Sequence, residues 1–167
     1  MHNLVRYERA TPEGKLHRPE IASGTIKNFG TWSLSSSGLL TIDGQGEMPH
    51  WPLWLGESWF PWREVRKHIR SVRIALGITS IAAWTFCDCS SLHSIHLPYS
   101  VTTIGEYAFH SCSSLSSITI PDGVTSIGSS AFSGCSSLKT ISVPAGLDLF
   151  GYRERPFFEP AEFFDGG

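Results

Sequence analysis

The sequence lacks most of the features that identify an enzyme or a membrane protein. It contains no nucleophile motif, no phosphate-binding glycine loop and no paired-carboxylate arrangement. No apolar run approaches the ~18 residues that span a membrane, and the N-terminal residues lack the hydrophobic segment of a signal peptide. The net charge of −2 gives no strongly basic field for nucleic acid. We therefore expect a protein that is not an enzyme, binds no nucleic acid, has no transmembrane segment and needs no cofactor.

Cysteine is also scarce, with four residues in the chain, and three of these lie 23 residues apart: Cys89, Cys112 and Cys135. Stacked side chains run parallel and do not face each other, so a disulfide is not expected. We predict buried free thiols in one column, since free cysteine behaves as a small hydrophobic residue. Cys87 lies outside this column, and we expect it to point outward. Neither the cysteines nor the histidines have the ligand number and spacing of a zinc site, so no metal is predicted.

The 23-residue step extends to the residues between the cysteines. It relates apolar positions, prolines and an Ala-Phe pair: Leu92/Leu115/Leu138, Ile95/Ile118/Ile141, Leu97/Ile120/Val143, Pro98/Pro121/Pro144, Ala108/Ala131 and Phe109/Phe132. A fixed period of this length is the signature of a solenoid, in which small units stack on their own copies. An earlier, degraded unit contains Ile69, Val72, Ile74, Ile78, Ile81 and Phe86, with Arg66 in place of the cysteine.

Each unit predicts the same short elements. The pattern Leu-x-x-Ile-x-Leu-Pro alternates with period two, which indicates a short strand that ends at the proline. A turn follows, and Val124 to Gly128 indicates a second short extended segment. Residues 130–135 are too few for a lasting helix and predict a single helical or 3₁₀ turn. Stacking such units produces a continuous core and an extended surface, with no deep pocket.

Two successive units, "SSLHSIHLPYSVTTIGEYAFHSC" and "SSLSSITIPDGVTSIGSSAFSGC", resemble the BspA-type leucine-rich repeat of microbial surface proteins. The resemblance implies a β-dominated α/β right-handed superhelix, that is, a leucine-rich-repeat solenoid with short helical or 3₁₀ turns. It also implies a non-enzymatic protein-interaction module that is exposed at the cell surface or secreted and is associated with adhesion. A secreted protein would then be present here in trimmed form. A cytoplasmic location is the alternative, and the residues alone do not decide between the two.

The chain is expected to divide into four parts. Residues 1–20 predict a flexible arm, and residues 21–64 an N-terminal cap with a β-hairpin, an aromatic loop and the start of a short helix. Residues 65–151 hold about four repeats. Residues 152–167 form a C-terminal cap or tail in which Phe157, Phe158, Phe163 and Phe164 cover the open end of the core.

Two candidate binding sites follow from these patterns. The alternation places Arg70, Arg73, His93 and His96 on the concave strand face with Tyr99 beside them, where charge, hydrogen-bond donors and an aromatic ring converge. Such a patch suits a protein or an anionic glycan. The alternative is a carbohydrate site in the aromatic region from Trp51 to Trp62, which includes Trp54 and Trp59. Packing of these rings over the first repeat is the favoured interpretation of the aromatic region, since repeat ends must be covered. The sequence does not identify the partner or the oligomeric state.

Overall fold

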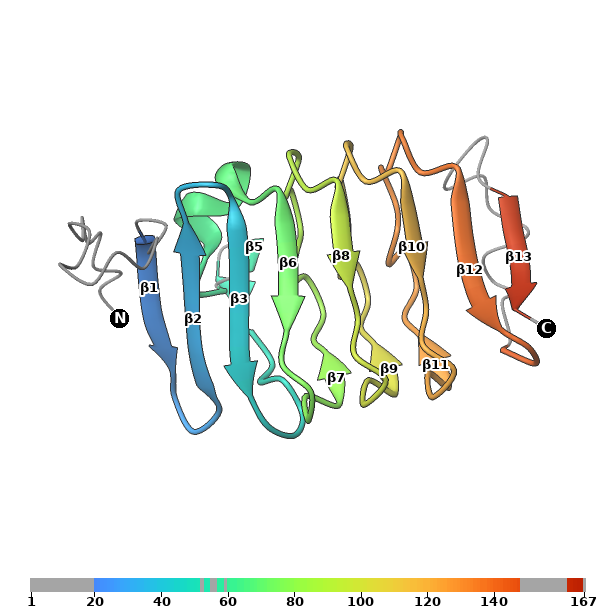
Figure 1. Ribbon diagram of the computed structural model, residues 1–167, viewed down its shortest axis with the longest axis horizontal. Coiled ribbons are helices and arrows are strands. Elements are labelled where there is room, and N and C mark those ends of the chain that lie inside the picture. The colour runs from blue at the N-terminus through green and yellow to red at the C-terminus, as the bar shows by residue number, and fades with distance from the viewer. Residues whose placement is uncertain (1–19, 52, 55–56, 59, 148–161, 167) are drawn as a thin grey trace, which may run out of the picture.

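The structure is a computed structural model that describes residues 20–51, 53–54, 57–58, 60–147 and 162–166. The chain forms a β-solenoid that is mostly strand, as the 23-residue period predicts (Figure 1). The elements are β1 (Glu20–Ile26), β2 (Gly30–Ser35), β3 (Leu39–Gly44), β4 (Leu53–Trp54), β5 (Glu57–Ser58), η1 (Arg63–His68), β6 (Ser71–Ile74), β7 (Ser80–Ile81), β8 (Ser94–His96), β9 (Thr103–Ile104), β10 (Ser117–Thr119), β11 (Ser126–Ile127), β12 (Thr140–Pro144) and β13 (Glu162–Gly166).

Two rows of parallel strands carry the repeat. The first row contains β6, β8, β10 and β12, and the second contains β7, β9 and β11. Pairing follows the sequence step, since Arg73 pairs with His96 and Ser117 with Thr140. The described residues therefore hold three complete turns, and β12 begins a fourth. In each repeat the predicted helical or 3₁₀ turn is a run of turns with hydrogen bonds between residues three apart, as in a 3₁₀ turn; Ser133 N, for example, donates to Ser130 O at 3.1 Å.

The predicted hairpin is present and extends the first row. Strands β2 and β3 are antiparallel, and β3 pairs in parallel with β6. The sequence did not predict β1, which pairs antiparallel with β2 and forms the outer strand of this sheet. The 3₁₀ helix η1 lies where the sequence predicted a helical stretch, and Trp62 and Ile69 at its two ends are fully buried.

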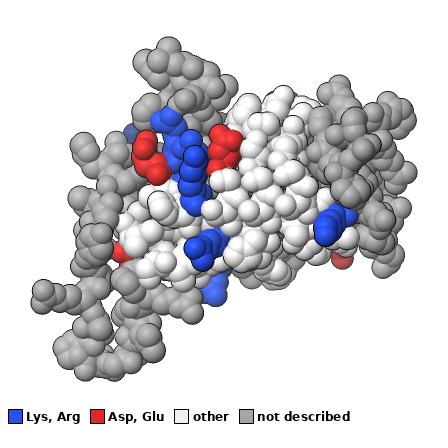
Figure 2. Space-filling model, turned by 90° about the horizontal axis from the view of Figure 1, so that it is seen from above, with Lys and Arg blue, Asp and Glu red and all other residues white. Residues whose placement is uncertain are grey.

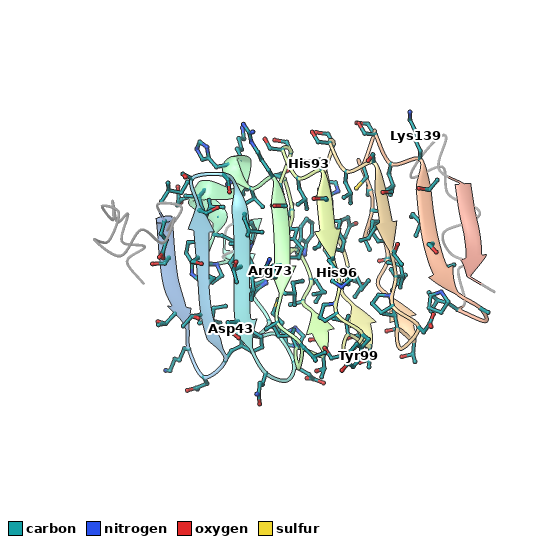
Figure 3. The ribbon with its side chains drawn as sticks, viewed as in Figure 1. Asp43, Arg73, His93, His96, Tyr99 and Lys139 are labelled. Carbon is teal, nitrogen blue, oxygen red and sulfur yellow. The ribbon has the colours of Figure 1, made fainter. Side chains whose placement is uncertain are left out.

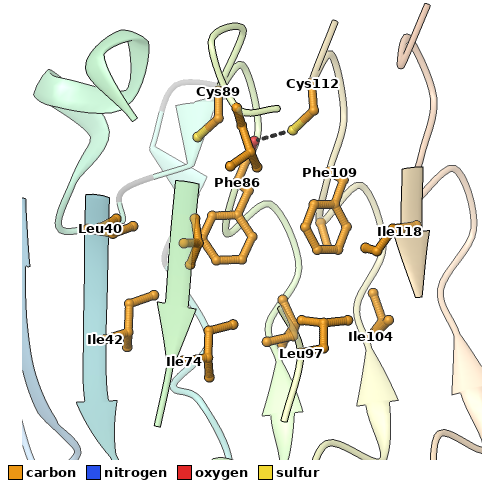
Figure 4. Packing of buried hydrophobic residues seen from close by; sticks show 14 of the residues in the cluster. Leu40, Ile42, Ile74, Phe86, Cys89, Leu97, Ile104, Phe109, Cys112 and Ile118 are labelled. Atoms are coloured by element: carbon orange, nitrogen blue, oxygen red, sulfur yellow. Dashed lines mark hydrogen bonds between the residues drawn. The ribbon is translucent and has the colours of Figure 1, made fainter. Parts of the chain in front are cut away.

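The core is a set of ladders along the solenoid axis (Figure 4). Trp62, Phe86, Phe109 and Phe132 form one stack, in which the Phe86–Phe109 and Phe109–Phe132 ring centroids are each 5.3 Å apart. The cysteine column runs beside it, and all four cysteines are free, as predicted. Cys112 Sγ donates to Phe86 O at 3.1 Å and Cys135 Sγ donates to Phe109 O at 3.0 Å, so each buried thiol joins its own turn to the previous one.

Two glycines let adjacent turns approach closely. A Cβ atom on Gly105 would lie 2.4 Å from the Ala83 nitrogen, and one on Gly128 would lie 2.3 Å from the Glu106 nitrogen. These distances are shorter than a Cβ atom can tolerate, so the residue after Ile104 or Ile127 has to lack a side chain. The backbone itself sets the spacing between turns at this column.

Candidate functional site

The outward face of the first row of strands is the candidate site, and we call it the strand face. Its residues alternate with the buried ones. On β10, Ile118 is buried while Ser117 and Thr119 are exposed. Most outward side chains are small hydroxyl residues: Thr31, Ser33, Thr41, Ser71, Ser94, Ser117, Thr119, Thr140 and Ser142. Because these side chains are short, any larger side chain on the strand face projects beyond its neighbours.

The five residues predicted from the sequence lie along two neighbouring strands of this face (Figure 3). Arg73 on β6 and His96 at the end of β8 are paired in register, and both are exposed. His93 N donates to Arg70 O at 3.0 Å, so these two residues also lie side by side, at the upper edge in Figure 3. Tyr99 lies at the lower edge. The five residues thus form a stripe that runs parallel to β6 and β8, and we call it the β6–β8 stripe.

Positive charge is concentrated at the upper end of the β6–β8 stripe. Arg66, Lys67 and His68 at the end of η1 precede Arg70. Seen from above, Lys and Arg gather on one part of the molecule, with Asp or Glu side chains directly on either side of the cluster (Figure 2). No described carboxylate forms an ion pair with Arg70 or Arg73, whereas Arg63 contacts Glu64 at 3.7 Å.

Sequence reasoning did not assign two features of this face to the site. Leu76 is 57% exposed and belongs to the same column as Tyr99, which is 77% exposed. The 23-residue step could have identified Leu76, because the column continues with polar or small residues, Asp122 and Ala145. Asp43 also lies on this face, at the lower edge (Figure 3). Because it belongs to the hairpin, no repeat relates it to the other residues.

The aromatic region before the first repeat packs inward where the structure describes its side chains. Trp62 is fully buried and stacks on Phe86. Trp51 is half-buried, meets Trp62 edge to face, and donates from Nε1 to Thr85 Oγ1 at 2.9 Å. The side chains of Trp54 and Trp59 lie outside the described residues. Trp51 and Trp62 therefore belong to the cap over the first turn.

Cys87 is only partly outward. Its side chain is half-buried, and burial together with the adjacent Asp88 raises the pKa of the thiol to about 12. Burial also raises the pKa of Cys89, and the contact with the Cys135 thiol raises that of Cys112. A protonated thiol fits the geometry at Cys112, whose Sγ atom donates a hydrogen bond to Phe86 O.

The described part of the chain has no group of three or more His, Cys, Asp or Glu side chains able to hold a metal ion. Within that part, no helix is long and apolar enough to cross a membrane. His93 and His96 are exposed, and neither forms an ion pair with a described carboxylate.

Comparison with known proteins gives one family and several solved structures. Residues 65–154 match the model of the BspA type leucine rich repeat region in six copies. No curated protein matches the chain. A leucine-rich repeat protein from Eubacterium ventriosum is 25% identical with a TM-score of 0.59, and the match covers 75% of this chain and 38% of that one. The chain thus spans less than half the length of that protein.

Two further solved structures are more distant. A leucine rich cell surface protein from Faecalibacterium prausnitzii is 20% identical, with a TM-score of 0.39 over 72% of this chain and 54% of that one. A leucine-rich repeat protein from Bacteroides capillosus is also 20% identical, with a TM-score of 0.43 over 72% of this chain and 97% of that one.

Proposed function

Because the chain belongs to the BspA-type leucine-rich repeat family, we propose that it is a non-enzymatic interaction module that binds another protein through the β6–β8 stripe. A solenoid of this size presents an extended surface, and function resides in the side chains placed on it. Proteins of this family are typically associated with the cell surface. The proposal therefore includes a surface or secreted location and a role in adhesion.

The register of Arg73 with His96 is the observation that carries the proposal. These two exposed side chains lie on adjacent strands, about 4.8 Å apart at the backbone. Their neighbours on both sides are short, with Thr41 in register with Arg73 on β3 and Thr119 in the same column on β10. A partner that approaches the strand face therefore meets the arginine and the histidine first.

The partner is expected to carry negative charge opposite the stripe. Complementary charge steers association and selects the partner. Arginine is also enriched at the energetically dominant positions of protein interfaces, together with tyrosine. An anionic glycan is the second candidate, because Arg70 and Arg73 would attract it equally. For the Trp51–Trp62 region, the inward packing of Trp51 and Trp62 supports a role as a cap and gives no support to a sugar site.

A capture experiment tests the proposal. The full chain would be immobilised and exposed to extracellular-matrix proteins and to glycans, and the bound species would be measured again with the double variant Arg70→Ser/Arg73→Ser. We expect binding to fall in the variant and to weaken with salt in the wild type, since exposed charges are screened over about 8–10 Å. Lys139→Ser is the matched control, because Lys139 lies in the column of Arg70 at the far end of the strand face. Unchanged capture by the double variant would move the site elsewhere.

A further inference from the structure

The lower end of the β6–β8 stripe is apolar. Leu76 and Tyr99 are the large hydrophobic side chains that are exposed among the described residues. The 23-residue step places them side by side on neighbouring turns, directly after the strands that carry Arg73 and His96. The next residue in the column, Asp122, is charged, so the apolar pair is confined to the same two turns as the basic residues.

Acidic residues flank this apolar pair. Asp43 lies at the same lower edge in Figure 3, and it follows Ile42, whose carbonyl accepts a hydrogen bond from Ala75 N at 2.9 Å. Asp122 follows Tyr99 in the column on the other side. Both carboxylates are exposed, and neither forms an ion pair within the part of the chain that the structure describes. From Arg70 and Arg73 to the residues that flank Leu76 and Tyr99, the charge of the strand face therefore changes sign.

This change of sign discriminates between the two classes of partner. A uniformly anionic glycan long enough to cover the stripe would be attracted by Arg70 and Arg73 but would bring its remaining charges against Asp43 and Asp122. Juxtaposed like charges are unfavourable and suppress the wrong partner. A polypeptide can instead place different side chains at the two ends. Apolar and aromatic side chains are also the groups that Leu76 and Tyr99 would remove from water.

We propose that the stripe binds an extended polypeptide segment that lies along β6 and β8, with an acidic side chain over Arg70 and Arg73 and an apolar or aromatic side chain over Leu76 and Tyr99. This inference rests on the proposed function and specifies its ligand. Arg73 lies on β6 and Leu76 lies in the turn that follows it, so their separation of three residues spans at most about 10 Å. The acidic and apolar side chains of the ligand should therefore be separated by a similar number of residues. Ser71 and Ser94 are in register between Arg70 and Arg73, and their short side chains leave room for the acidic side chain of the ligand between the two arginines.

The probe is a random dodecapeptide library displayed on phage and selected against the full chain. Selected peptides would then be synthesised and their affinities measured for three double variants: Arg70→Ser/Arg73→Ser, Leu76→Ser/Tyr99→Ser, and Lys139→Ser/Ala145→Ser. The third is the matched control, because Lys139 and Ala145 occupy the columns of Arg70 and Leu76 two or more turns away. All six positions are exposed, so the variants should fold, and their melting temperatures would confirm it.

We expect selected peptides to combine an acidic and an apolar residue at this separation. Each of the first two variants should lose about tenfold or more in affinity, while the control keeps the wild-type value. Salt should weaken peptide binding to the wild type and to Leu76→Ser/Tyr99→Ser. The residual affinity of Arg70→Ser/Arg73→Ser should depend little on salt, because the two charges are absent.

Other outcomes would overturn the inference in distinguishable ways. Peptides that need the arginines but tolerate Leu76→Ser/Tyr99→Ser would refute the apolar contact and leave the proposed function intact. Peptides that tolerate both changes would refute the inference and the proposed function together. If no selected peptide depends on the stripe, while heparin, used as an anionic glycan, binds with an affinity that Arg70→Ser/Arg73→Ser abolishes, the ligand is a glycan.

Discussion

At the scale of single residues, the aromatic stack joins each turn of the solenoid to the next. Phe109 is fully buried between Phe86 and Phe132, and its ring is stacked on both of theirs. Each ring in the stack belongs to a different turn, so the contacts that stabilise one turn are made with its neighbours. A short repeat has too little apolar surface to fold alone, and these contacts provide the missing burial.

Phe109→Ala should therefore lower the free energy of unfolding by about 3–5 kcal/mol, a large part of the ~5–15 kcal/mol typical of a domain. Urea denaturation of the two proteins measures the difference. Thr119→Ala, on the exposed face of β10, is the control and should change stability by less than about 0.5 kcal/mol. An unmoved midpoint for Phe109→Ala would contradict the stacked core.

The thiols allow a second prediction at this scale. A thiol reacts as the thiolate, and burial with Asp88 raises the pKa of Cys87 to about 12. Labelling of the native protein should thus be slow near neutral pH and accelerate as the pH rises toward that value. Cys87 should react first, because Cys89, Cys112 and Cys135 are fully buried. Mass spectrometry after brief labelling identifies the site, and a disulfide between any two column cysteines would refute the prediction.

The site could be predicted from the sequence only in part. Alternation within a strand places Arg73, His96 and their neighbours on the outer face, and the 23-residue step places them side by side. The 23-residue period cannot predict where a residue outside the repeats lies. Asp43 reaches the strand face only because β3 pairs with β6, and this pairing depends on a contact between a hairpin and a repeat that share no pattern.

At the scale of elements, the strands inside a regular pattern could be predicted from the sequence, and those outside it could not. The paired short strands of each turn and the hairpin β2–β3 follow from periodicity and turn residues. Strand β1 does not, because Glu20–Ile26 lacks a regular alternation of buried and exposed positions; its register also shifts between Glu20 and Ala22. The extended conformation of β1 depends on its pairing with β2, a contact that its own sequence does not reveal.

The end of the solenoid supplies an element-scale prediction. β13 pairs in parallel with β12, from Thr140 and Glu162 to Pro144 and Gly166, so it covers the edge of the last strand. Deletion of residues 152–167 should expose that edge and cause self-association, because unpaired strand edges template further pairing. Light scattering coupled to size-exclusion chromatography measures the mass of both forms.

A truncated chain that stays monomeric with unchanged stability would show that the C-terminal residues are only a tail. The predicted contribution of Phe157 and Phe158 to this cap lies outside the described residues and stays a prediction.

At the scale of the whole molecule, buried side chains from Ala22 to Val143 form one continuous cluster. Each turn nevertheless contacts mainly its neighbours, so stability approximates a sum of unit and interface terms. All six tryptophans lie between residues 32 and 84, at the N-terminal end of this array. Tryptophan fluorescence therefore reports on the cap and the first turn, whereas circular dichroism reports on every strand.

Phe132→Ala should separate these two signals. The change weakens the C-terminal turn, which then unfolds at a lower urea concentration than the cap, so the loss of circular dichroism should begin before the change in fluorescence. In the wild type the two transitions should coincide. Coincident transitions in Phe132→Ala as well would indicate that the solenoid unfolds as one cooperative unit.

The close approach at Gly105 and Gly128 has a consequence for how such a surface can diversify. Backbone contacts at these glycines and the pairing of adjacent strands hold neighbouring turns at a fixed distance. The outward positions of the strand face are then held at a fixed spacing, and the side chain at each position can be substituted independently. New recognition properties can arise by substitution at these positions, as Leu76 and Tyr99 illustrate beside Asp122 and Ala145, while the scaffold beneath them keeps its dimensions.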